Sequence, residues 1–312
     1  MIGVALLNLG SPETPAEIPD YIRRLLSDPD VLPLPWPIRQ LVGRVAAYRR
    51  SGFVAEHYRA IGGRSPLHAE TRRQVEALRS ALGRDFVVRF AFRHSTPFAG
   101  PVLDGLVAAG VKRVVALPAY PQYSRTTTGS GVRELRREAF KRGVEICEVR
   151  SYPDAPGYLD ALAEETTKLL EPGAHVLYCA HGLPLRIVEA GDPYVDEVER
   201  SVRALVSRLP TGTSHSLAFQ SRVGRMKWTG PYLRDELRRL GAEGVRALVL
   251  VPLSFVCENL ETLYELDIEH AALATEAGIK RYRRVPTPGS HPSFIRALGE
   301  LCRQAVQDAG WE

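Results

Sequence analysis

The sequence predicts an α/β protein made of two similar doubly wound, Rossmann-like domains, each built on a parallel sheet. Short apolar runs alternate with longer amphipathic segments along the whole 312-residue chain. The two halves also repeat the same order of strands and turns. A Pro-containing stretch at residues 151–158 lies between them. Such alternation is typical of parallel sheets that are covered by helices on both faces.

The predicted strands are mostly short runs rich in Val, Leu and aromatic residues. They are IGVALLNL (2–9), FVVRFAFR (86–93), RVVALPAY (113–120), EICEVRSY (145–152), HVLYCAHG (175–182), SLAFQSRV (216–223), RALVLVPLS (246–254) and RYRRVPTP (281–288). Amphipathic segments between them, such as 69–82 and 194–209, predict the covering helices.

Corresponding strands of the two halves end in corresponding turns. NLGSP matches AHGLP, AFRHS matches FQSRVG, and LPAYPQYSRTTTGSG matches VPLSFVCENLETL. We therefore predict an N-terminal domain at 1–153 and a C-terminal domain at 154–312, whose last helix (about 291–312) packs back on the first domain. Ligands of such sheets bind beyond the carboxyl ends of the strands, so these turns are expected to line a cleft between the domains.

The composition is that of an ordinary globular protein, with 45% hydrophobic and 25% charged residues. The net charge is +5, but the basic residues are scattered, so we expect no nucleic-acid partner. The four cysteines are far apart, which indicates a reducing compartment without disulfides or structural zinc. The N-terminus is interpreted as a first strand rather than a signal peptide, and no apolar run reaches the roughly 20 residues of a membrane span. A cytoplasmic location is expected.

An unusual acidic run, LVLVPLSFVCENLETLYELDIEHA (248–271), follows a buried strand. On an α-helix, Glu258, Glu261, Glu265 and Glu269 would fall within an arc of roughly 80°. Like charges at this spacing repel each other by a few tenths of a kcal/mol per pair. Because this face carries no Lys or Arg of its own, we interpret it as built to meet a cation or protons.

AHGLP places His181 at the end of the equivalent strand, so His181 and the first acids of the run are candidate neighbours. His181 is either a turn residue with a backbone partner or an imidazole aimed into the cleft for proton transfer or metal ligation. The motifs HExxH, GxSxG, GxGxxG and GxxxxGK[ST] are absent. The TTTGSG run (126–131) is either a capped helix start, the favoured interpretation, or a grip for a carboxylate or phosphate.

The segment SDPDVLPLPWPIRQLVGRV (27–45) combines Pro33, Pro35 and Pro37 with apolar residues that are candidates for exposure, namely Val31, Leu32, Leu34, Trp36 and Ile38. Because proline disfavours a helix, we expect a loop here. It either packs on its own domain, forms a lip over a large apolar ligand, or touches a membrane.

These motifs together resemble the ferrochelatases, the enzymes that insert ferrous iron into a porphyrin to make haem. The segments that carry the resemblance are LLNLGSPE (6–13), HYRAIGGRSPL (57–67), FAFRHSTP (90–97), YPQYSRTTTGS (120–130), AHGLP (180–184), GDPY (191–194), AFQSRVGRMKWTGP (218–231) and SFVCENLETLYELDIE (254–269). The resemblance implies a lyase that acts on protoporphyrin IX or coproporphyrin III. The alternatives are a cobalt or nickel chelatase for another tetrapyrrole and a non-catalytic haem or metal carrier.

The resemblance also implies the site residues. His181 and Glu261 match the catalytic iron-site residues, and Glu265 and Glu269 match an acidic row that handles metal and the two released protons. Arg24 and Arg93 would bind propionates, although Arg93 could instead form a salt bridge at the domain interface. The positions that match the porphyrin pocket are Leu9, Arg24, Tyr58, Ser65, Arg93, Tyr123 and Trp228.

Two departures from the family pattern bear on ligands. Leu9 stands where some relatives carry a Tyr that can ligate iron. Arg125 follows YPQYS and Cys302 is alone near the C-terminus, so the thiolates of a two-iron two-sulfur cluster are not matched. We therefore expect no permanently bound cofactor and no iron–sulfur cluster. Expected partners are porphyrin and ferrous iron, a membrane surface at 27–45, and transiently the neighbouring enzymes of the haem pathway.

Overall fold

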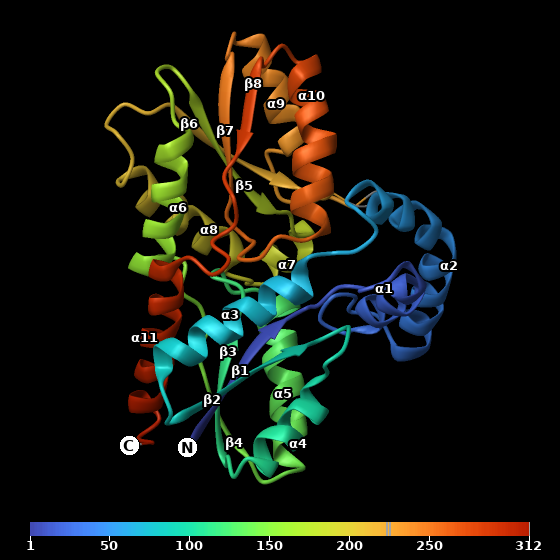
Figure 1. The fold of residues 1–312 in the computed structure, drawn as a ribbon. Helices are drawn as coiled ribbons and strands as arrows, with labels where there is room; N and C mark the ends of the chain where they lie inside the picture. Colours follow the sequence, from blue (N-terminus) through green and yellow to red (C-terminus); the bar gives the residue numbers. More distant parts are fainter. Residues whose placement is uncertain (223, 225, 312) are drawn as a thin grey trace. The chain divides into compact units, whose positions relative to one another are not determined.

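The computed structural model describes residues 1–222, 224 and 226–311, and the chain divides into two compact units. The first unit comprises residues 1–151 and 295–312, and the second comprises residues 152–294. Within the described residues, each unit contains one parallel sheet of four strands (Figure 1). The predicted α/β class with two similar halves is thereby confirmed.

The sheets of the two units have the same strand order. In the first unit the order is β2-β1-β3-β4, where the strands are β1 (Ile2–Asn8), β2 (Phe86–Phe92), β3 (Arg113–Pro118) and β4 (Glu145–Glu148). In the second unit the order is β6-β5-β7-β8, where the strands are β5 (His175–His181), β6 (His215–Gln220), β7 (Ala247–Pro252) and β8 (Arg281–Arg284). The strand order therefore reverses around β1 and around β5, the positions at which open α/β sheets bind ligands.

Each predicted strand is present, but several end earlier than predicted. The last residues of the predicted runs, such as Leu9 and Arg93, leave the sheet and begin the loops at its carboxyl edge. Several predicted runs overshoot because apolar residues such as Leu9, Ala119 and Val149 continue beyond the end of the strand. Val223, at the end of the predicted strand 216–223, and Glu312, at the end of the predicted last helix, lie outside the described residues.

Helices cover the sheets, as expected for strands that are apolar on both faces. Those of the first unit are α1 (Ile18–Ser27), α2 (Trp36–Ala60), α3 (Leu67–Leu82), α4 (Ala99–Ala108) and α5 (Ser130–Phe140). Those of the second unit are α6 (Pro156–Leu169), α7 (Leu185–Glu189), α8 (Tyr194–Val206), α9 (Leu233–Ala242) and α10 (Ala271–Glu276). Most of α11 (Pro292–Asp308) belongs to the first unit, where Arg303 donates a hydrogen bond to the carbonyl of Ala81.

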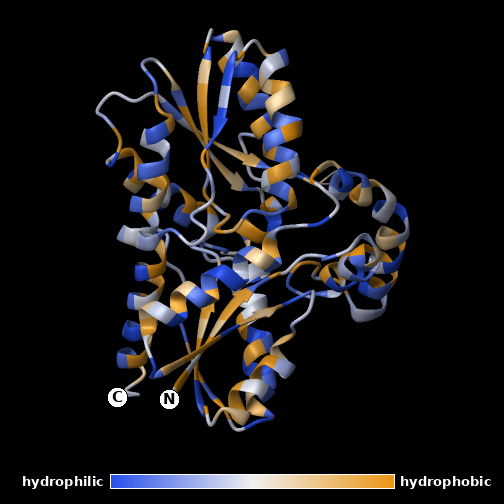
Figure 2. Ribbon diagram, in the orientation of Figure 1, coloured by the Kyte–Doolittle hydropathy of each residue, from blue (hydrophilic) through white to orange (hydrophobic). Residues whose placement is uncertain are grey.

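Each core lies between its sheet and the covering helices. In the first unit, Leu7 of β1 packs with Leu103 of α4 and Leu135 of α5. In the second, Leu177 of β5 packs with Leu237 of α9. Figure 2 shows the strands coloured mostly as apolar. Full burial of a leucine contributes about 1.5–3 kcal/mol to the free energy of unfolding. These packed layers therefore stabilise the sheets that position the strand ends.

The segment 27–45 is not a loop throughout, which corrects the prediction. Helix α2 begins at Trp36, with Pro37 in its first turn. Proline is tolerated there because its missing N–H would have no partner within the helix. Only residues 28–35 are irregular, and the remainder of the segment is the first part of a 25-residue helix.

The acidic run is also not an α-helix as predicted. Residues Glu261–His270 form a π-helix, and Glu258 lies before it. The wider i→i+5 turn of a π-helix is rare and often occurs at functional sites. No helix in the described part of the chain is long and apolar enough to cross a membrane.

Candidate active site

The carboxyl ends of β5, β6 and β7 bring several polar residues of the second unit together. His181 ends β5, Gln220 ends β6, and Ser254 follows β7. The AHGLP turn packs closely here, because the N–H of Gly182 donates to the carbonyl of Gln220 at 2.9 Å. A Cβ at residue 182 would lie only 2.9 Å from that carbonyl oxygen, so glycine is required.

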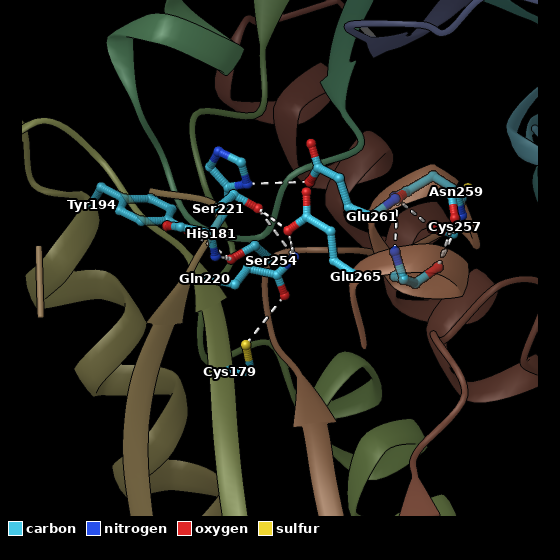
Figure 3. Close-up of polar contacts among 11 residues, drawn as sticks. Cys179, His181, Tyr194, Gln220, Ser221, Ser254, Cys257, Asn259, Glu261 and Glu265 are labelled. Carbon is cyan, nitrogen blue, oxygen red and sulfur yellow. Dashed lines mark hydrogen bonds and ion pairs between the residues drawn. The ribbon is translucent and has the colours of Figure 1, made fainter. Parts of the chain in front are cut away.

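The backbone of His181 is held by two hydroxyl groups. Its N–H donates to Ser254 Oγ at 2.9 Å, and the Tyr194 hydroxyl donates to its carbonyl at 2.9 Å. The hydroxyls of Tyr194 and Ser254 are 2.6 Å apart, which closes the network (Figure 3). Burial raises the pKa of Tyr194, so this phenol remains a donor. Sequence reasoning assigned no role to Tyr194 or Ser254, although Tyr194 ends the GDPY segment.

His181 and Glu261 form the centre of the site. His181 Nδ1 lies 3.1 Å from Glu261 Oε2, and about a third of each side chain is exposed, 33% and 36% (Figure 3). Glu261 begins the π-helix, where its N–H is capped by Asn259 Oδ1 at 2.7 Å. The predicted proximity of His181 and the acidic run is therefore confirmed, and the imidazole contacts a carboxylate rather than the backbone.

The carboxylates change the protonation of His181. Burial by itself would lower its pKa, but the charge of Glu261, the hydrogen bond to Glu261 and the charge of Glu265 together raise it. The imidazolium form is therefore stabilised beside Glu261.

Glu265 lies beside this pair. Burial and the charge of Glu261 raise the pKa of Glu265 to about 7, although the Ser221 hydrogen bond and His181 act in the opposite direction. Ser221 Oγ donates to Glu265 Oε2 at 2.5 Å, and Gln220 Nε2 donates to the same oxygen at 3.2 Å. Near neutral pH, Glu265 is therefore poised to gain or lose a proton.

The other acids of the run already have cationic partners. Arg284 of β8 pairs with Glu258 at 3.0 Å and with Asp267 at 2.6 Å. Arg234 of α9 pairs with Glu269 at 3.0 Å. The run has no Lys or Arg on its own face, as the sequence shows, and the arginines that neutralise its outer acids come from other elements. Glu261 and Glu265 are the members that have no arginine partner within the described residues.

Arg24 and Arg93 of the first unit line one cavity of about 270 Å³. Arg93 is held by the buried Asp28 at 3.0 Å and by Ser130 Oγ at 2.8 Å. Arg93 thus forms a salt bridge, but within the first unit rather than at a domain interface as the alternative proposed. Arg24 lies over the ring of Phe98, with 5.1 Å between the guanidinium carbon and the ring centroid.

The other residues predicted to line a porphyrin pocket differ in exposure. Tyr58 is only 2% exposed, and Ser65 is buried with its Oγ accepting from the N–H of Leu67. Their burial gives no support to a direct ligand contact. Leu9 is partly exposed, and the Tyr120 hydroxyl accepts a hydrogen bond from its N–H at 2.8 Å.

Tyr123 and Trp228 are both partly exposed. Tyr123 lies under the guanidinium of Arg150 in the first unit. Trp228 pairs with Pro184, so it lies beside the turn that carries His181. In the TTTGSG region, Ser124 Oγ accepts from the N–H of Thr126, which confirms the capped helix start.

The fold is that of the α/β metal chelatases. A structure of SirB from Bacillus subtilis with Fe³⁺ matches with a TM-score of 0.59, covering 78% of this chain and 91% of SirB at 15% identity. A cobalt complex of the sirohydrochlorin chelatase SirB from Bacillus subtilis subspecies spizizenii matches with a TM-score of 0.57, covering 79% of this chain and 92% of that chain at 14% identity. At these identities, the likeness shows the fold alone.

The chain belongs to the ferrochelatase family, whose model matches residues 1–306. It is 38% identical to the ferrochelatase of Nostoc punctiforme over all of this chain and 84% of that protein. It is 36% identical to the ferrochelatase of Aquifex aeolicus over 97% of this chain and 99% of that protein. The predicted resemblance is confirmed, and with it a lyase of haem biosynthesis whose substrates are a porphyrin and ferrous iron. The alternatives of another metal chelatase or a carrier are not favoured.

Proposed function

We propose that His181, Glu261 and Glu265 are the centre at which iron enters the porphyrin and protons leave it. Insertion of one Fe²⁺ replaces the two pyrrole N–H protons, so the site must admit a dication and release two protons. The observation that supports this role is the contact of His181 Nδ1 with Glu261 Oε2 at 3.1 Å, beside a third ionisable group. The pKa values of His181 and Glu265 are both raised in this site, which suits groups that exchange protons as a metal ion enters.

His181 is assigned as the acceptor of a pyrrole proton. Its Nδ1 is engaged by Glu261, whereas its Nε2 has no hydrogen-bond partner in the described part of the chain. A proton taken up at Nε2 produces an imidazolium that Glu261 stabilises through Nδ1–H. This arrangement is that of a general base oriented by a carboxylate.

Glu265 and Glu261 are assigned as the carboxylates that meet iron. Carboxylates are suitable ligands for Fe²⁺. Because the pKa of Glu265 is about 7, the arriving dication would displace its proton readily. Glu269 is a weaker candidate than predicted, since Arg234 already neutralises its carboxylate.

For the porphyrin, we propose that Arg24 binds a propionate and that Trp228 contacts the ring. Arg24 has no carboxylate partner among the described residues, whereas Arg93 already pairs with Asp28. Guanidinium groups bind carboxylates strongly through two parallel hydrogen bonds. The cleft that would bring these residues of the two units onto one porphyrin stays a prediction.

The assignment is tested by mixing the protein anaerobically with Fe²⁺ and either protoporphyrin IX or coproporphyrin III. Conversion of the free-porphyrin absorbance to that of the metalloporphyrin, faster with one of the two, would identify the substrate. Parallel reactions with Co²⁺ and Ni²⁺ measure the metal preference. Absence of turnover with Fe²⁺ and both porphyrins would contradict the proposed function.

We further propose that helix α2 attaches this protein to a membrane surface from the cytoplasmic side. Ile38, Leu41, Val45 and Tyr48 repeat at helical spacing and are 48%, 61%, 44% and 91% exposed. We name these four residues the α2 stripe. Exposed arginines at 44, 49 and 50 lie on the same helix. An exposed apolar stripe accompanied by arginines is typical of helices that bind anionic lipid surfaces.

A further inference from the structure

Ser221 has an unusual backbone conformation at the edge of the site. Its φ is +65°, and it is the one non-glycine residue with a positive φ among the described residues. This left-handed region is disfavoured for residues that carry a Cβ, and serine is not among those that visit it routinely. Strained conformations of this kind persist where the surroundings hold them, commonly at functional sites.

In this conformation, the side chain of Ser221 forms hydrogen bonds with Glu265 and Gln220. Its hydroxyl donates to Glu265 Oε2 at 2.5 Å and accepts from Gln220 Nε2 at 3.3 Å (Figure 3). Gln220 Nε2 also donates to the same Glu265 oxygen at 3.2 Å. Gln220 is itself held from β5, because the thiol of Cys179 donates to its Oε1 at 3.2 Å.

The strand geometry explains why the positive φ matters. Successive side chains of a strand point to opposite faces, so residues 220 and 221 would normally diverge. Here both reach one oxygen of Glu265, because β6 ends at Gln220 and Ser221 leaves the extended conformation with its positive φ. The two donors occupy Oε2, and Oε1 of Glu265 has no partner within the described residues.

We propose that Ser221 is a positioning residue for metal insertion, whose hydroxyl fixes the Glu265 carboxylate with Oε1 directed to the incoming metal ion. This inference rests on the proposed function of Glu265. A turn that needed only a positive φ would be served better by glycine, which adopts it without strain. The reason for a serine at this position is therefore its hydroxyl, which donates to Glu265.

Two substitutions separate the hydroxyl from the backbone strain. Ser221→Gly removes both, and Ser221→Ala removes only the hydroxyl. We expect both variants to raise the KM for Fe²⁺, or lower kcat, by about 10- to 100-fold, the usual effect of losing a hydrogen bond to a charged group. The KM for porphyrin should stay within about twofold. Ser221→Gly should have a higher Tm than Ser221→Ala, because glycine adopts a positive φ without strain.

The matched control is Ser216→Ala, which removes a hydroxyl from β6, the strand that precedes Ser221. Ser216 Oγ contacts His175 Nε2 at 2.8 Å, and both residues lie at the opposite end of β5 and β6 from His181. This variant should keep wild-type kinetics for both substrates. Equal damage in the control, or wild-type metal kinetics in Ser221→Gly, would overturn the positioning role.

A double-mutant cycle with Glu265→Gln shows whether Ser221 acts through Glu265. If it does, Ser221→Gly should have no further effect on metal kinetics in the Glu265→Gln background, and additive effects would contradict the inference. Full activity of Glu265→Gln alone would refute the proposed function of Glu265. An impaired Glu265→Gln together with an unimpaired Ser221→Gly would refute the positioning role only.

Discussion

At the scale of single residues, the site depends on which ionisable groups have partners and which do not. Arg284 and Arg234 neutralise the outer acids of the run, while Glu261 and Glu265 remain beside His181. Burial and the charge of Glu261 raise the pKa of Glu265, and the two carboxylates together stabilise the cationic form of His181. Glu261 and Glu265 are therefore the carboxylates of the run that are available to a ligand.

His181→Ala and Glu261→Gln should each remove most of the metallation activity. Loss of a general base typically costs about 10²–10⁴ in rate, and Glu261→Gln removes the charge while keeping the shape. Both variants should fold and still bind porphyrin, measured as quenching of the protein's tryptophan fluorescence by the bound porphyrin. His215→Ala, the same substitution at an exposed histidine of β6, is the control. Near-normal turnover of folded His181→Ala would contradict the assigned role.

The raised pKa of Glu265 predicts how stability depends on pH. The folded state retains a proton up to about pH 7, whereas a free glutamate loses it near 4.5. The free energy of unfolding should therefore fall as pH rises between these values, because the folded state binds more protons there. The raised pKa of His181 likewise lowers the free energy of unfolding as pH rises above 6.5, because folded His181 holds its proton longer than a free histidine.

The measurement is urea unfolding of the wild type and Glu265→Gln between pH 5 and 8.5. The Gln variant cannot titrate at this position, so its stability should decrease less with pH, and it should be the more stable protein at pH 8.5. Parallel stability curves for the two proteins would show that Glu265 has an ordinary pKa in the folded state.

At the scale of elements, periodicity predicted strands well and helix type poorly. The i, i+4 spacing of Glu261 and Glu265 suits an α-helix, and it also keeps these side chains adjacent on the π-helix that is present. The start of α2 at Trp36 was not predicted from the sequence, for a different reason. Pro33, Pro35 and Pro37 all argue against a helix, but the last of them falls in the first turn, where proline is tolerated.

The α2 stripe should determine attachment to lipid. Replacing Leu41 and Tyr48 with Ser should reduce co-sedimentation with vesicles of phosphatidylcholine and phosphatidylserine by at least about fivefold, because two exposed apolar anchors are lost. The control is Phe140→Ser on α5, since Phe140 is exposed outside the stripe. Unchanged sedimentation of the stripe variant would show that the helix serves another purpose.

At the scale of the whole molecule, the sequence was sufficient for the fold class and for the strand ends that carry His181 and Gln220. Short apolar runs that alternate with longer amphipathic segments predict the strands and helices of a parallel sheet. Long-range pairing was not predictable in the same way. The partners of Glu258 and Glu269 lie on β8 and α9, and Tyr58 is buried by contacts that no local pattern encodes.

The protonation of the cysteines bears on the expected absence of an iron–sulfur cluster, which stays a prediction. A cluster is commonly held by four thiolates, so every cysteine of this chain would have to be deprotonated. Burial raises the pKa of Cys147 to about 11, that of Cys302 to about 12, and that of Cys179 well above its ordinary value. All three therefore favour the neutral thiol at neutral pH.

We expect protein purified anaerobically to contain no acid-labile sulfide and to show no visible absorbance other than that of bound porphyrin or haem. Cys302→Ser should then leave iron insertion within about twofold of wild type, since its thiol would hold no cluster. The measurement is a sulfide and iron assay on porphyrin-free protein, followed by the metallation assay of the variant. Two sulfides per chain in the wild type, lost in Cys302→Ser together with activity, would show that this thiol ligates a cluster.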